Sequence, residues 1–327
     1  MPSPFSTFAF FLLPLFFLFL GCGQDQGEAP NEEMSSKVET VGEKKEKNST
    51  LSKIPTSEKQ NTKIDPAETQ SSSIDEISPT IDRIQKILAK ANPKYRGQGK
   101  FHQENGVIVA AELPNCELRD LSPLRGLKLQ GLDLSGNPVR EIRHLKGMPL
   151  RNLFLENTNV ESLRELNDAK LVELRLNNSP IQSLHGLEGQ PLENLYAVST
   201  RITEVSPLRS SNLRQLWLSE SPVSDVSGLA GLPLVSLTLH RTLIEDVFFV
   251  RSLPLLERLH IGDTMVEDLT PLAGMNLTRL VFTPSRIKRG MNVVRSLYGL
   301  REIGTVFDDT GRDLSSPEAF WTKFSSN

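Results

Sequence analysis

The chain has 327 residues, a formal net charge of −3 and a pI near 6.0, and 24% of its residues are charged. This charge composition is typical of an ordinary soluble protein. It lacks the excess of basic residues that binds nucleic acid, so we expect no nucleic-acid partner. Only two cysteines are present, Cys22 and Cys116. If one of them is modified, no disulfide can form within the chain.

The first distinctive segment is apolar throughout, from residue 8 to residue 20. Its length of about 13 residues is short of the roughly 20 that cross a bilayer, and it is typical of a signal peptide. Residues 1–10 contain no Lys or Arg, so the α-amino group is the only positive charge ahead of the segment. The pattern predicts export.

The segment ends on Leu18-Phe19-Leu20-Gly21-Cys22. This resembles the lipobox of bacterial lipoproteins, in which a small residue precedes a cysteine that is acylated and becomes the new N-terminus. Gly21 and Cys22 match, and Phe19 stands where the family prefers Leu. The resemblance implies a signal peptide over residues 1–21 and lipidation of Cys22. The alternative is a plain secretory signal whose cysteine is incidental.

A lipid on Cys22 would place the protein in a bacterial cell envelope, anchored to a membrane. Gly23 follows the cysteine, where Asp in well-studied lipoprotein families signals retention at the inner membrane. The outer membrane is therefore favoured, and the inner membrane stays open as the alternative.

The next segment, residues 22–76, is predicted to be a disordered tether that begins at the lipidated cysteine. Residues 24–76 are rich in Glu, Ser, Lys, Thr and Gln and contain no Phe, Tyr or Trp. Too little apolar surface is available there to offset the entropy lost on ordering. As a flexible coil the segment spans on the order of 40 Å, which suits a spacer.

From residue 128 the chain repeats itself every 21 residues. Six unbroken copies run from 128 to 253, a seventh (254–275) carries one extra residue, and degenerate copies flank them at about 107–127 and 276–297. The common pattern L-x-x-L-x-L-x-x-[N/S/T]-x-[V/I]-x-x-[L/I/V]-x-x-L resembles the leucine-rich repeat in signature and period. Phrases such as "EDLTPLAGM" (267–275) resemble internalin-type repeats.

The pattern also has a direct structural interpretation. Leu132 and Leu134 alternate with period two, as on a strand, and Val139, Ile142 and Leu145 recur every third position, as in a 3₁₀ turn. One repeat cannot bury its own leucines, so neighbours stack. We expect an α/β solenoid, a leucine-rich-repeat horseshoe with parallel strands on the concave face and a 3₁₀ or irregular convex side.

The ninth position of the motif is usually Asn in this family, where its side chain satisfies buried backbone groups as the strand turns. Here one Asn is followed by hydroxyl residues, which can do part of that work. The residues at this position are Asn137, Thr158, Ser179, Thr200, Ser221, Thr242, Thr264 and Ser285.

Caps are expected at both ends of the solenoid. Residues 78–93 are predicted to form an amphipathic helix, and Asn105-Gly106 predicts a hairpin, within a cap and first degenerate repeat at 77–127. The repeats proper span 128–275. In the C-terminal region, 276–327, Ser316 and Pro317 predict the start of a second capping helix.

A candidate site follows from the strand position between two leucines, whose side chains point to the concave face in one ladder. We expect ligand binding at Phe154, Arg175, Tyr196, Trp217 and His260, with cation–π contacts of Arg175 to its aromatic neighbours. The competing explanation is that aromatic residues suit strands anyway. The ladder consists of Asp133, Phe154, Arg175, Tyr196, Trp217, Thr238, His260 and Val281.

The sequence contains no nucleophile elbow, H-E-x-x-H, phosphate loop or Cys-x-x-Cys. A metal or hydrolytic site at His240, His260 and Asp263 is the remaining alternative of that kind. We expect no enzyme, cofactor or metal.

The expected function is that of a monomeric, membrane-anchored protein that binds a protein or peptide partner of the cell envelope through its concave face. A glycan-binding module and a structural envelope lipoprotein without a dedicated ligand are the alternatives.

Overall fold

The computed structural model describes residues 80–308 and 311–325, which belong to one compact unit. Its α-helices are α1 (Ile81–Ala91), α2 (Met291–Arg295) and α3 (Pro317–Ser325). Its strands are β1 (Lys100–Glu104), β2 (Val107–Glu112), β3 (Gly131–Asp133), β4 (Asn152–Phe154), β5 (Glu173–Arg175), β6 (Asn194–Tyr196), β7 (Gln215–Trp217), β8 (Ser236–Thr238), β9 (Arg258–His260), β10 (Arg279–Val281), β11 (Glu302–Gly304), β12 (Phe307–Asp308) and β13 (Gly311–Arg312).

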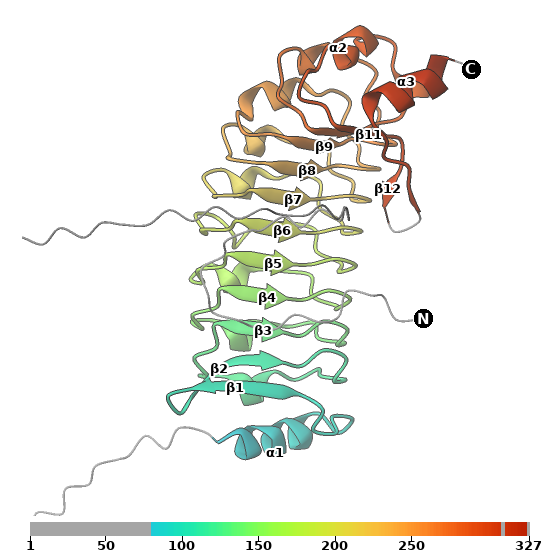
Figure 1. Cartoon of the computed structure of the whole chain (residues 1–327). Helices are drawn as coiled ribbons and strands as arrows, with labels where there is room; N and C mark the ends of the chain where they lie inside the picture. Colours follow the sequence, from blue (N-terminus) through green and yellow to red (C-terminus); the bar gives the residue numbers. More distant parts are fainter. Residues whose placement is uncertain (1–79, 309–310, 326–327) are drawn as a thin grey trace, which may run out of the picture. The chain divides into compact units, whose positions relative to one another are not determined.

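One sheet of eleven strands runs through the repeats in sequence order, β1 to β11 (Figure 1). The β1–β2 pair is antiparallel, and every later pair of neighbours in this sheet is parallel. The prediction of a leucine-rich-repeat solenoid is confirmed, because each 21-residue copy supplies one strand and one return.

The core lies between the strands and the returns. In the second copy Leu153, Leu155, Val160 and Leu163 are all 0% exposed, and every other full copy buries the same positions, apart from Val226, which is partly buried. Most returns hold a short 3₁₀ helix, as the period of three predicts: η1 (Ser122–Leu124), η2 (Arg143–Leu145), η3 (Arg164–Leu166), η4 (Ser206–Leu208), η5 (Ser227–Leu229), η6 (Phe248–Ser252) and η7 (Thr270–Leu272). The return of the copy 170–190 is irregular, and η8 (Pro284–Arg286) directly follows β10.

The ninth motif position is buried from Asn137 to Thr264, where the chain leaves the sheet. Thr158 donates a hydrogen bond to the Leu155 carbonyl three residues earlier, at 2.7 Å, and Thr242 and Thr264 repeat this bond. Ser285 departs from the pattern, because it lies exposed within η8, where the regular repeat has ended.

The N-terminal cap forms as predicted. Helix α1 buries Ile84 and Leu88 against the first repeat, and its N-cap Thr80 accepts a bond from the Arg83 amide. Asn105 and Gly106 both take positive φ, 51° and 79°, in the tight turn between β1 and β2. After this turn, β2 runs parallel to β3, the first strand of the regular repeats.

The C-terminal cap is also helical. Pro317 opens α3, and the Ser316 hydroxyl accepts a hydrogen bond from the Ala319 amide. Trp321 packs edge-on against Phe320, with the Arg295 guanidinium over its ring. Trp321 therefore packs within the C-terminal cap.

The predicted signal peptide (1–21), with Cys22 and the tether (22–76), lies outside the described residues. Among the residues that are described, none of the helices has the length and apolar character needed to cross a membrane. Cys116 is 1% exposed, and its burial raises the pKa of the thiol to about 11. Cys116 is therefore a buried core residue.

Candidate functional site

The outward side chains at the third position of each strand stand opposite one another in register. Phe154 pairs with Arg175, Arg175 with Tyr196 and Tyr196 with Trp217 along neighbouring parallel strands. The same register continues to Asp133 on one side and through Thr238 and His260 to Val281 on the other. The predicted ladder is therefore present, at the spacing of about 4.8 Å that separates strands.

Arg175 lies between two aromatic rings. Its guanidinium carbon is 4.6 Å from the centroid of Phe154 and 5.3 Å from that of Tyr196, which confirms the expected cation–π contacts. Glu173, on the same strand, accepts a bond from Arg175 Nε at 2.7 Å. Because this carboxylate balances the charge, the guanidinium acts here mainly as a flat, fixed surface between rings.

Tyr196 and Trp217 extend the stack. Their ring centroids are 5.4 Å apart at 72°, an edge-to-face contact, and the Tyr196 hydroxyl donates to Gln215 Oε1 at 3.2 Å. Trp217 is 36% exposed, whereas Tyr196 is half-buried. We call Phe154, Arg175, Tyr196 and Trp217 the aromatic row. Its exposed end is Trp217, and each member contacts a neighbouring member of the row.

Polar groups line one side of the aromatic row. Asn177 donates to Glu156 Oε1 at 2.7 Å and accepts a bond from the Val198 amide at 2.9 Å. Burial raises the pKa of Glu156, against the opposing effects of Arg175 and Asn177. The row thus has an aromatic centre beside a fixed polar edge, which is the layout of an interface core and rim.

His260 takes its expected place in the ladder but is only 4% exposed. Its ring packs at 80° to that of Phe307 of β12, with the centroids 6.3 Å apart, so a segment that follows the last repeat covers it. The exposed part of the ladder is therefore centred on the aromatic row. Sequence periodicity could not show this cover, because β12 lies outside the repeats.

The alternative metal site does not assemble. The His240 and His260 rings are stacked at 4.8 Å and 25°, so their in-plane lone pairs cannot converge on one ion. Asp263 instead contacts Arg241 at 3.4 Å and accepts a bond from Thr283. Within residues 80–308 and 311–325, no group of three or more His, Cys, Asp or Glu side chains could hold a metal ion.

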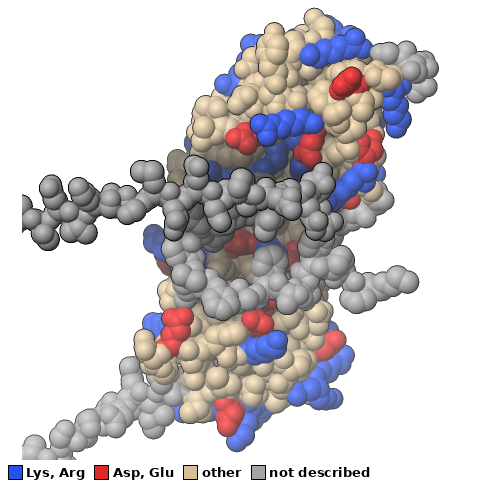
Figure 2. Space-filling view, viewed as in Figure 1, with Lys and Arg blue, Asp and Glu red and all other residues tan. Residues whose placement is uncertain are grey.

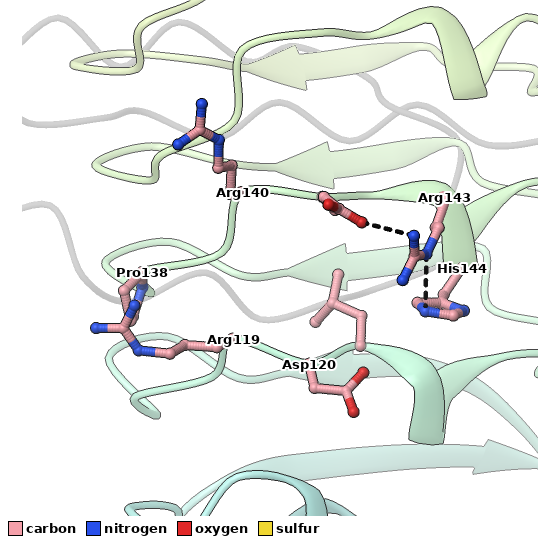
Figure 3. Close-up of a pocket in the computed structure, with 8 residues that line it drawn as sticks. Arg119, Asp120, Pro138, Arg140, Arg143 and His144 are labelled. Carbon is pink, nitrogen blue, oxygen red and sulfur yellow. Dashed lines mark hydrogen bonds and ion pairs between the residues drawn. The ribbon is translucent and has the colours of Figure 1, made fainter.

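A hollow of about 290 Å³ lies in the loops that follow β2 and β3 (Figure 3). It is lined largely by charged residues, several of which have partners: Arg143 contacts Glu141 at 2.9 Å and the His144 ring at 3.4 Å, while Asp120 accepts bonds from Ser122. Figure 2 shows acidic and basic residues interspersed on the visible part of the face drawn. Neither feature competes with the aromatic row as a binding surface.

Comparison with known proteins yields solved structures only. No protein-family model and no curated protein matches the chain. The crystal structure of internalin C2 from Listeria monocytogenes is 24% identical, with a TM-score of 0.55, and the match covers 63% of this chain and 97% of that one. Internalin F from the same species is 17% identical, with a TM-score of 0.39, over 71% of this chain and 93% of that one.

At such identities the likeness to internalin C2 concerns the fold alone. It agrees with the 21-residue period, the parallel strands and the 3₁₀ returns described above. The chain therefore folds as a leucine-rich-repeat solenoid, as internalin C2 does.

Proposed function

We propose that this protein is a non-enzymatic binding protein of a bacterial cell envelope, anchored by lipid on Cys22, that holds a protein or peptide on its concave face. The aromatic row is the observation that supports the proposal most. A side-by-side Phe, Arg, Tyr and Trp on four consecutive strands supplies the residue types that dominate protein interfaces. The fold presents them on rigid strands, so little entropy is lost on binding.

The proposal predicts a large loss of binding when the exposed end of the row is truncated. Hot-spot residues contribute about 2 kcal/mol or more each, or roughly thirtyfold in affinity. Tyr196→Ala with Trp217→Ala in the full chain should therefore abolish capture of the partner from a detergent extract of envelopes. Circular dichroism would show first that the double variant retains the wild-type fold.

The matched control removes exposed aromatic side chains elsewhere. Phe248 is 57% exposed in η6 and Tyr298 is fully exposed, and neither belongs to the sheet. Phe248→Ala with Tyr298→Ala should leave capture unchanged. Equal capture by all three proteins would contradict the assignment of the aromatic row. A captured species that resists protease and is removed by glycosidase would favour the glycan alternative, and no retained species would favour a structural role.

The lipid anchor has its own test, with the second cysteine as the control. Metabolic labelling with a palmitate analogue should label the wild type and Cys116→Ala, and should not label Cys22→Ala. Cys116 suits this purpose because its thiol is buried, with a pKa of about 11, and so is not a nucleophile at neutral pH. A label that persists in Cys22→Ala would contradict lipidation at Cys22, and a wild type that takes up no label would favour the secretory-signal alternative.

A further inference from the structure

After the last repeat the chain turns back over the outward face of the sheet. Ile303 of β11 and Ser315 exchange two backbone hydrogen bonds of 3.0 Å, and Asp313 accepts bonds from the Thr305 and Val306 amides. Between these anchors lie β12 and β13, which pair antiparallel. We call β12 and β13 the C-terminal hairpin. It lies beside β8 and β9 (Figure 1), where Phe307 meets His260.

Phe307 fixes the hairpin to the ladder. Its ring lies under two guanidinium groups, Arg279 at 4.9 Å and Arg312 at 4.8 Å, and edge-on to His260. Arg279 is itself paired with Glu302 of β11. All of these ring contacts are made by one aromatic side chain. The hairpin therefore buries little apolar surface against the sheet.

Beneath the hairpin lie two buried, stacked histidines. His240 and His260 are 3% and 4% exposed. His240 Nδ1 lies 3.0 Å from the Gly262 carbonyl oxygen, which can only accept, so Nδ1 carries the hydrogen. Its Nε2 lies 3.4 Å from Asp308 Oδ2 of the hairpin. The hairpin carboxylate therefore lies against the His240 ring.

No carboxylate of the described residues hydrogen-bonds to His260, and the nearby Asp308 and Asp263 only partly oppose the lowering of its pKa by burial. Neither of its ring nitrogens has a hydrogen-bond partner among the described residues, and both are buried. The nearest acid on its own loop, Asp263, is engaged by Arg241, which also pairs with Glu220. The remaining charges that face the pair from the hairpin side are the Arg279 and Arg312 guanidinium groups around Phe307, which are positive.

We propose that the C-terminal hairpin is an acid-released strap: protonation of His260 beside His240 opens it and uncovers His260, which lengthens the exposed ladder. The physical reason is that a positive charge on the His260 ring is costly in the closed form, because the ring is buried and has no hydrogen-bond acceptor within the part of the chain that the structure describes. This inference does not depend on the proposed partner.

The direction of the pH dependence follows from linkage. Burial, and next the neighbouring His240, lower the pKa of His260 to about 3 in the closed form, whereas an exposed histidine titrates near 6.5. Above pH 6.5 the ring is neutral in both forms and the strap is fully stable. As the pH falls from 6.5 toward 3, only the open form takes up the proton, so the opening constant rises about tenfold per pH unit.

Hydrogen–deuterium exchange of the full chain between pH 7.5 and 4.5, corrected for intrinsic rates, tests the proposal. Peptides covering residues 303–313 should lose protection progressively below pH 6.5, about a hundredfold by pH 4.5, while the strands β3 to β7 stay protected. His260→Phe keeps an aromatic ring without the charge and should remove the pH dependence. His185→Phe, at an exposed histidine, should leave it as in the wild type.

Two outcomes would overturn the proposal: hairpin protection that does not change with pH, and loss of protection that is the same in His260→Phe. If that variant does not fold, titration of the His260 ring protons by NMR in the wild type decides. The ring should become charged together with the loss of hairpin protection. A ring that becomes charged near pH 6.5 while the hairpin stays protected would contradict the strap.

Discussion

Replacing Asn137 with alanine is expected to lower the free energy of unfolding by about 3–5 kcal/mol, because several buried backbone groups lose their partners at once. The Asn137 side chain is 1% exposed. Its Oδ1 accepts bonds of 2.9 Å from the amides of Cys116 and Leu118, and its Nδ2 donates at 2.7 Å to the carbonyls of Leu113 and Leu134. It thus joins the first repeat to the cap.

The control for Asn137 is the same motif position one copy later. Thr158 is also buried, but its hydroxyl makes a single bond, to the Leu155 carbonyl. Thr158→Ala should therefore cost only about 1 kcal/mol. Urea denaturation followed by circular dichroism measures both, and hydrogen exchange over residues 113–137 locates the loss. Equal costs would mean that the Asn137 network does not hold the cap to the repeats.

The second large effect is expected at Gly228, where alanine should destabilise by about 2–3 kcal/mol through overpacking. Gly228 lies in η5, close against the preceding repeat. A β-carbon there would lie 2.7 Å from the Val205 carbonyl carbon and 2.8 Å from Ser206 Cα, and closer still to the Val205 carbonyl oxygen. All three are backbone atoms, so the return that contains Gly228 and the return of the preceding repeat would have to move apart.

His144 occupies the same position of an earlier copy, where a full side chain is accommodated in η2. His144→Ala should therefore change the free energy of unfolding by less than about 0.5 kcal/mol. Thermal and urea unfolding of the two variants beside the wild type would show the difference. A Gly228→Ala protein as stable as the wild type would mean that the spacing between returns is not set by this contact.

The repeats alone were enough to predict the solenoid and the ladder. A period of 21 with leucines at fixed positions permits only one stacking register, because a slip by one residue would turn Leu153 out of the core. Phe154, Arg175, Tyr196 and Trp217 were therefore predictable neighbours, although they are far apart in the chain. The Asn105-Gly106 hairpin and the Ser316 cap were equally local signals.

The tertiary structure alone decided which part of the ladder is exposed. His260 and Trp217 have the same position in their repeats, yet one is 4% and the other 36% exposed. The difference comes from Phe307 and Asp308, which lie beyond the repeats and fold back over them. The tertiary structure also determines that residue 228 must be glycine, because a β-carbon there would collide with the backbone of the preceding repeat. Periodicity encodes contacts between equivalent positions of successive repeats; contacts between a repeat and a non-repeating segment have no period, and only the folded chain determines them.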